Sequence, residues 1–191
     1  MLILHLYVSV LPLLKRYTVM FQTKEPMLHR ATDEQLRLMK EFVMCFIQPN
    51  ALMNKSVKQI VQLDLSAPSN CLPDKDMFVG PGVKKLCESA DIVVLSFIKT
   101  ARKTFMACGS YLQLKMPVTN KILRHVSAHD PFVKAQGHAL QYMLALPSLA
   151  TNVLMESEEA AYDLEVCRLH IDNALPEATC TTRLDICVSI W

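Results

Sequence analysis

The stretch "DIVVLSFIKTARKTFMACGSYLQLK", residues 91–115, decides the fold. Its apolar residues recur at every third or fourth position, which is the period of an amphipathic α-helix and not the alternation of a β-strand. Lys99, Arg102 and Lys103 lie on the other side of this helix. We therefore predict one long helix, with Cys108 as a buried and unreactive thiol in its apolar stripe. The residues of the stripe are Val94, Leu95, Ile98, Ala101, Phe105, Cys108 and Leu112.

The same helical period recurs in shorter segments along most of the chain. The chain has only 4 glycines in 191 residues, which argues against a β fold built on glycine turns. We therefore expect a mainly α fold, an irregular helical domain fragment with little or no sheet. Helix should exceed half of the residues and strand should stay below about 15%. The shorter helical segments are residues 11–21, 27–47 or 33–47, 54–65, 117–130, 136–146 and 157–172.

Prolines and small polar residues predict where these helices begin and end. Pro12 should end the first apolar run, Pro26 should separate the first two helices, and Pro147 should end the helix before it. Thr32 and Asp33 are residue types that cap a helix N-terminus, so we expect the second helix to begin beside them. Ser56 is the corresponding cap of the short helix that follows.

The opening run "MLILHLYVSVLPLL" contains no Lys, Arg, Asp or Glu. It is shorter than the roughly 20 apolar residues of a membrane helix, and no basic residue precedes it as in a signal peptide. We interpret it as a helix or strand that is buried against a partner segment missing upstream, and we predict no membrane association. Apolar patches should be exposed at Leu2–Leu14 and at Ile186–Trp191, where protein partners can bind.

Overall charge and cysteine spacing narrow the class of protein. Twenty basic and eighteen acidic residues leave a net charge of +2, so bulk electrostatics predicts no polyanionic partner. Seven cysteines stand at irregular spacing and none forms a C-x-x-C pair. This usage is typical of reduced thiols in an intracellular protein.

No stretch contains a complete catalytic, cofactor-binding or metal-binding motif. His125 and His129 share a helix face, but the glutamate and further ligands of a zinc motif are absent. The turn at Gly80 and Gly82 lacks the Lys-Ser/Thr ending of a phosphate-binding loop. We predict no catalytic residue, no metal, no cofactor and no small-molecule substrate.

Basic side chains form the one candidate binding surface. Acidic residues are nearly as numerous, and Tyr111 is the only aromatic residue near them, so an ordinary solvated face is the favoured interpretation. Any DNA binding through this surface should be weak and should fall steeply with salt. The candidate nucleic-acid-binding residues are Lys99, Arg102, Lys103, Lys115, Lys121 and Arg124.

Several short motifs occur in an order that resembles hAT-type transposase-like proteins of animals. The resemblance covers nearly the whole chain. The first motifs are Phe21-Gln22, Pro26-Met27-Leu28-His29 and Cys45-Phe46-Ile47-Gln48-Pro49. The later ones are "SVKQIVQLDLSAPSNCLP" (56–73), the Gly80/Gly82 turn, "KMPVTNKILRHVSAHDP" (115–131) and "TTRLDICVSIW" (181–191).

The resemblance implies a helical region that interrupts or flanks an RNase H-like catalytic core. No residue here matches that core's metal-binding acids, so the resemblance implies a chain without enzymatic activity. We expect residues 1–191 to be a single helical region of a transposase-like protein, truncated at both ends or domesticated, and intracellular or nuclear. The alternative is a nucleic-acid-binding accessory surface retained without the nuclease.

Overall fold

The structure, a computed structural model, describes residues 2–22, 27–86, 92–130, 133, 136–151 and 154–171. About 70% of this part of the chain is helical. Its one β pairing is an isolated antiparallel bridge between Ile47 and Cys71. The prediction of a mainly α fold is therefore confirmed. The turn predicted at Pro26 and the apolar patch predicted at Ile186–Trp191 lie outside the described residues.

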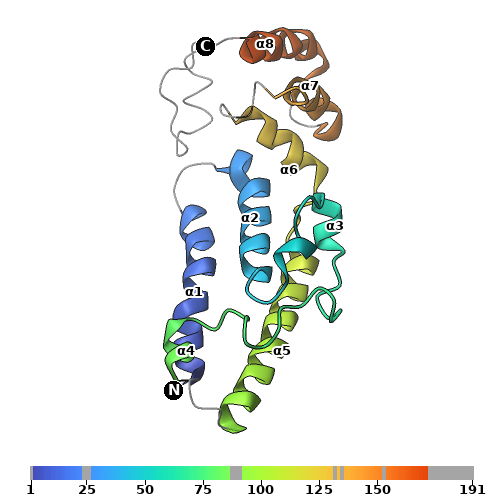
Figure 1. The fold of residues 1–191 in the computed structure, drawn as a ribbon. Helices are drawn as coiled ribbons and strands as arrows, with labels where there is room; N and C mark the ends of the chain where they lie inside the picture. Colours follow the sequence, from blue (N-terminus) through green and yellow to red (C-terminus); the bar gives the residue numbers. More distant parts are fainter. Residues whose placement is uncertain are drawn as a thin grey trace. The chain divides into compact units, whose positions relative to one another are not determined.

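Figure 1 shows the helices of the described chain, which belong to two compact units. One unit comprises Met1–Met20 and Gln35–Met116, and the other comprises Phe21–Glu34 and Pro117–Trp191. The α-helices are α1 Leu2–Met20, α2 Ala31–Val43, α3 Val57–Val61, α4 Pro81–Leu86, α5 Ile92–Lys115, α6 Lys121–Val126, α7 Ala139–Leu149 and α8 Glu159–Ile171. Single turns of 3-10 helix are η1 Leu28–Arg30, η2 Pro49–Ala51, η3 Ser127–His129 and η4 Glu156–Glu158.

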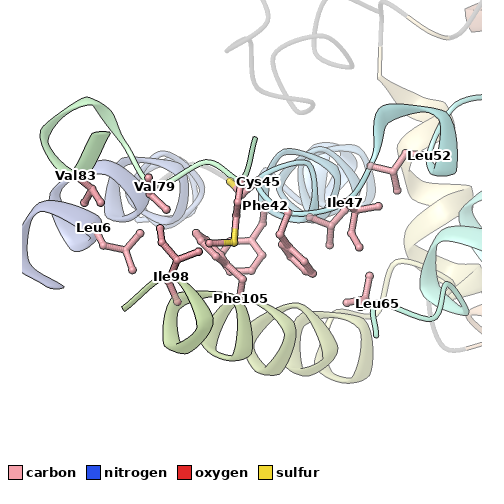
Figure 2. Close-up of a cluster of buried hydrophobic side chains, with 14 residues drawn as sticks. Leu6, Phe42, Cys45, Ile47, Leu52, Leu65, Val79, Val83, Ile98 and Phe105 are labelled. Carbon is pink, nitrogen blue, oxygen red and sulfur yellow. The ribbon is translucent and has the colours of Figure 1, made fainter. Parts of the chain in front are cut away.

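Three aromatic rings lie at the centre of the first unit's core. The Phe46 and Phe105 rings stack with centroids 5.7 Å apart, and the Phe42 ring meets Phe105 edge-on at the same distance. Figure 2 shows Phe42 and Phe105 facing each other from α2 and α5. A methyl group added to Gly109 would come within 2.8 Å of Leu65 Cδ1 and 3.1 Å of Phe46 Cζ. The missing side chain at this position of α5 therefore lets the helix pack closely against Phe46.

Backbone hydrogen bonds fasten the loop that follows α3 to the end of α2. The carbonyl oxygens of Cys45 and Phe46 accept hydrogen bonds from the amides of Phe78 and Leu72, at 2.7 and 2.8 Å. The sequence predicts turns throughout residues 66–76, and the structure describes no helix there. Two of the motifs that carry the family resemblance, 45–49 and 56–73, therefore pair with each other.

Helix α1 packs against α4 through two glycines. Gly80 has a φ of +82°, and a methyl group there would overlap the side chain of Ser9 in α1. A methyl group on Gly82 would lie 2.5 Å from Nδ1 of His5. The Gly80/Gly82 pair is thus a turn before a helix, as predicted, and it is also the surface on which α1 lies.

Helix α1 is longer than predicted. It continues through Pro12 from Leu2 to Met20, whereas Pro12 was predicted to end the opening apolar run and a helix was predicted over residues 11–21. Val8, whose carbonyl loses its helical donor at residue 12, is exposed together with Pro12, so water can satisfy that carbonyl. Leu6 is the only residue of α1 that is buried. The predicted exposure of apolar residues is confirmed at Ile3, Leu4, Tyr7, Val8 and Leu11.

The other helix boundaries follow their predictions more closely, with one exception. Ser56 caps α3 in a capping box with Gln59, as its residue type predicts. Helices α5 and α8 begin within a few residues of their predicted starts. The cap prediction at Thr32 and Asp33 is wrong, because α2 already begins at Ala31, directly after η1. Asp33 lies instead in the first turn, where its negative charge suits the helix dipole.

Helix α7 passes through Pro147 and ends at Leu149, although Pro147 was predicted to end it. Proline has no amide hydrogen to donate to the carbonyl four residues earlier, which is that of the fully buried Met143. The hydroxyl of Tyr162 in α8 donates to this carbonyl at 2.8 Å. A side chain from the next helix therefore replaces the missing backbone donor.

We expect Tyr162→Phe to lower the free energy of unfolding by about 1–3 kcal/mol, because a buried carbonyl then lacks a donor. The same change in a Pro147→Ala background should cost less, since alanine at this position supplies the helical amide that proline lacks, while the contact of the hydroxyl with His129 is lost in both backgrounds. Urea titrations followed by circular dichroism measure both values. An equal cost of Tyr162→Phe in the two backgrounds would contradict this account of the hydrogen bond.

Candidate functional site

A long apolar groove between α1 and α5 is the candidate functional site of the first unit. Its first hollow has a volume of about 520 Å³. Leu6, Phe42 and Phe105 of the core contribute to its lining. We call this feature, together with the hollow that continues it, the α1/α5 groove. Side chains toward its edges include Tyr7, Leu11 and Leu14 from α1 and Thr104, Cys108 and Tyr111 from α5.

A second hollow, of about 740 Å³, continues the first toward the N-terminal ends of both helices. Leu6, Tyr7, Ala101 and Thr104 line both hollows. Lining residues run from 2 to 14 in α1, which corresponds to about 18 Å of helix at 1.5 Å per residue. The groove is therefore elongated and follows the axes of the two helices.

The lining offers apolar contact and almost no polar recognition. Among the described side chains, no Lys, Arg, Asp or Glu lines either hollow. The hydroxyl groups of Thr100 and Thr104 donate at 3.0 Å to carbonyls of α5 itself, at Ser96 and Thr100. A charged ligand would lose its hydration in this groove and gain no partner in return.

Cys108 is exposed and lines the groove, so the prediction of a buried thiol is wrong. The physical reason is the rotation of α5. Gly109, and not Cys108, is the residue that packs against Phe46 and Leu65. The apolar stripe of α5 is wider than the core, and its Cys108 edge faces the groove.

The predicted basic residues are divided between the two units. Lys99, Lys103 and Lys115 are exposed on α5. Arg102 instead binds within the protein, where its Nη2 lies 2.7 Å from Asp74 Oδ1 and donates to the Leu72 carbonyl at 2.6 Å. This guanidinium holds the loop after α3 against α5.

The remaining two basic candidates, Lys121 and Arg124, belong to α6 in the second unit and are exposed. The Arg124 guanidinium lies 5.2 Å from the centroid of the Tyr142 ring, which is a cation–π distance. Nucleic-acid binding by the six basic residues stays a prediction.

The second unit contains a buried polar cluster where η1 meets η3. Arg30 Nη1 lies 3.1 Å from Oδ2 of the buried Asp130. His29 is only 2% exposed, and the Nδ1 atoms of His29 and His129 are buried without a hydrogen-bond partner. Because the Tyr162 hydroxyl donates to Met143, His129 Nε2 is the donor in its 3.3 Å contact with that hydroxyl. His129 therefore carries a hydrogen on Nε2.

The histidines do not converge on a metal site. His125 and His138 lie against the Tyr142 ring, with centroid distances of 4.9 and 6.4 Å, whereas His129 contacts Tyr162. Across the part of the chain that the structure describes, no three His, Cys, Asp or Glu side chains are grouped to hold a metal ion.

We expect the second unit to lose stability as the pH falls from about 7 to 5. Burial lowers the pKa of His29 and of His129, with Asp130 partly opposing the shift at His29. Both imidazoles are protonated in the unfolded chain below about pH 6.5 but resist protonation in the fold, so their stabilising effect is full above that pH and is lost below it. Urea midpoints at pH 7 and pH 5 measure the effect. His29→Gln with His129→Gln should flatten the dependence, and an unchanged slope would contradict it.

Comparisons with known proteins do not assign this chain to a family. Searches of protein-family models, curated proteins and solved structures give no match to this chain. Among the described helices, α1 is long and apolar enough to cross a membrane, but the core helices of other proteins and signal sequences pass the same test.

Proposed function

We propose that this chain is a non-catalytic helical interaction module whose α1/α5 groove binds an apolar helix of a partner protein. The observation that carries the proposal is the elongated groove, with its two continuous hollows and its predominantly apolar, uncharged lining. Binding an amphipathic helix in a hydrophobic groove is a common mode of peptide recognition. A small ligand is less suited to this site, because pockets for small molecules place a few polar groups to fix orientation.

The proposed module derives from an hAT-type transposase and has lost or never contained the nuclease. The order of its short motifs supports this origin. The purified chain should neither cleave nor join DNA in Mg²⁺ or Mn²⁺. Metal-dependent strand transfer that one Asp→Ala change abolishes would show that the chain is an enzyme and would overturn this part of the proposal. A longer genomic reading frame that encodes a zinc finger and an RNase H-like core would overturn the fragment interpretation.

A neutral helical peptide tests the groove directly. The probe has 21 residues, with leucine at the a and d positions of each heptad and alanine or glutamine elsewhere. It is fluorescently labelled and kept at nanomolar concentration so that it does not self-associate. We expect saturable binding with a Kd below about 100 μM.

Matched charge insertions locate the binding site. Leu11 lines the groove and is 54% exposed, whereas Met53 is 62% exposed between η2 and α3 and lines neither hollow. Leu11→Glu should weaken peptide binding at least tenfold, and Met53→Glu should leave it unchanged. Equal affinity of the two variants would place binding elsewhere and overturn the proposal.

The alternative function, a nucleic-acid-binding surface, is favoured by one observation. Helix α5 carries four basic residues and no acidic residue. Charge reversal at Lys99 and Lys103 tests it, while Arg102 is left intact because its loss would release the loop that it holds. The alternative is supported if the protein binds duplex DNA in a salt-sensitive way, the double variant loses this binding, and the helical peptide does not bind. That combination would overturn the interaction module.

A further inference from the structure

We propose that the outer face of α1 lies on the surface of a membrane that contains anionic lipids. This face is distinct from the α1/α5 groove, and the inference does not rest on the proposed function. Three features of α1 lead to it: an exposed apolar stripe, basic residues at the end of that stripe, and one backbone carbonyl that needs contact with water.

Helix α1 exposes an apolar stripe on the side opposite its buried residue. At about 100° per residue, Leu4, Val8 and Leu11 lie within about 60° of one another, and the buried Leu6 lies on the opposite side of the helix. The three residues are 61%, 65% and 54% exposed. Leu4 and Val8 line neither hollow of the groove. A helix of a globular protein carries polar side chains on this side, so an apolar stripe here indicates a surface that meets an apolar partner.

Basic side chains follow the apolar part of the stripe. Lys15 lies two turns after Val8 on the same side of the helix, and Arg16 is next to it; both are exposed. Helix α4, which packs against α1, exposes Lys84 and Lys85. Neither α1 nor α4 contains an acidic residue. The charged side chains of these two helices are therefore all positive, which complements the anionic headgroups of a lipid surface.

Pro12 lies beside the stripe and decides between a lipid surface and a packed protein. Because proline has no amide hydrogen, the carbonyl of Val8 has no helical donor and depends on water. A second copy of α1 packed on the stripe would remove that water, and so would the hydrocarbon core around a spanning helix. At the boundary between headgroups and acyl chains, water still reaches the carbonyl while the apolar side chains leave water. The carbonyl therefore favours a helix that lies along the interface.

This placement differs from the sequence-based prediction of no membrane association. That prediction considered a spanning helix, which needs roughly 20 apolar residues, and a signal peptide. A helix that lies in the interface has no such length requirement, because only one of its faces has to be apolar. The face itself becomes visible only when burial shows which side of α1 the protein covers.

Flotation with lipid vesicles tests the inference. One set of vesicles is phosphatidylcholine alone, and in the other about a third of the lipid is phosphatidylserine. At about 0.1 M salt we expect the chain to bind the anionic vesicles at least about tenfold more tightly than the neutral ones. At about 0.5 M salt the ratio should fall below about threefold, because salt screens the headgroup charge. Alkaline carbonate should release the bound protein.

A charge in the stripe tests the position of the contact. Val8→Glu should weaken binding to the anionic vesicles at least about tenfold, since the stripe would then carry a negative charge into the interface. Met53→Glu is the matched control, because Met53 is 62% exposed between η2 and α3 and should not meet the lipid. Far-ultraviolet circular dichroism of both variants checks that the helices are intact.

Charge reversal at the end of the stripe tests the choice of lipid. Lys15→Glu with Arg16→Glu should remove the preference for anionic vesicles. Lys58→Glu with Lys75→Glu makes the same change in net charge at two exposed lysines, one in α3 and one in the loop after it. This control should change the preference less than about threefold, because these lysines do not adjoin the stripe.

Several outcomes would overturn the inference. These are binding to neither kind of vesicle, equal binding to both kinds, and retention after alkaline carbonate, which would mean a spanning helix. A dimer that Val8→Glu dissociates, without any vesicle binding, would show that a second copy covers the stripe. The proposed function is tested separately, since Val8 lines neither hollow and Val8→Glu should leave the affinity for the helical peptide unchanged.

Discussion

Replacing Phe46 by alanine is expected to lower the free energy of unfolding of the first unit by about 3–5 kcal/mol. The Phe46 side chain is fully buried. It stacks on Phe105 and meets Phe42 edge-on with centroids 6.5 Å apart. Truncation would remove these contacts and leave a cavity beside Gly109, where α5 has no side chain to fill it.

Urea titration followed by circular dichroism measures this loss. Phe78→Ala is the matched control, because the Phe78 ring is 39% exposed and its structural hydrogen bond uses only the backbone amide. If Phe46→Ala proves too unstable to purify, Phe46→Leu should show a smaller loss of the same kind. A loss no greater than that of Phe78→Ala would contradict the central place of Phe46 in the core.

Replacing Gly80 by alanine is expected to lower the free energy of unfolding of the first unit by about 2–5 kcal/mol. The left-handed backbone at φ +82° contributes about 1–2 kcal/mol for a residue with a side chain. The overlap of the new methyl group with Ser9 contributes about 1–3 kcal/mol more. Helix α1 would have to move away from α4 to relieve this overlap.

A second substitution separates the two contributions. Ser9→Gly in the Gly80→Ala background should remove the overlap and leave only the destabilisation that comes from the left-handed backbone. Gly82→Ala should cost less than Gly80→Ala, because its methyl group meets the imidazole of His5, which can rotate away. Equal losses at Gly80 and Gly82 would argue against the backbone contribution at Gly80.

Local patterns in the sequence predicted several elements of the fold correctly. The apolar period of residues 91–115 predicted α5, and Ser56 predicted the start of α3. Both signals are local, since helical period and an N-cap depend on residues within a few positions of each other. They can therefore be recognised in the sequence without knowledge of the tertiary structure.

The errors arose where a distant atom decides the outcome. Pro147 lies inside a helix because Tyr162, fifteen residues later, supplies the donor that the proline lacks. The partners of Arg102, Asp74 and Leu72, lie about thirty positions earlier in the chain and were likewise not predicted. No pattern in the neighbouring sequence reports such partners.

The groove could not be predicted for the same reason. Periodicity identifies an apolar stripe but not which part of it another helix covers. The stripe of α5 includes both Phe105, which is buried in the core, and Cys108, which faces the groove. The breadth of this stripe, which exceeds what the core covers, was the available signal.

The pairing of the loop after α3 with the end of α2 has a consequence for how this fold tolerates change. The links from Leu72 and Phe78 use backbone amides and carbonyls, so they do not depend on which side chains the loop presents. Between these anchors, residues 73–76 are exposed. Inserted or exchanged residues at 73–76 would leave the anchors intact, provided that Asp74 is kept for Arg102. This tip is therefore the place in the first unit at which to graft a tag or a foreign epitope.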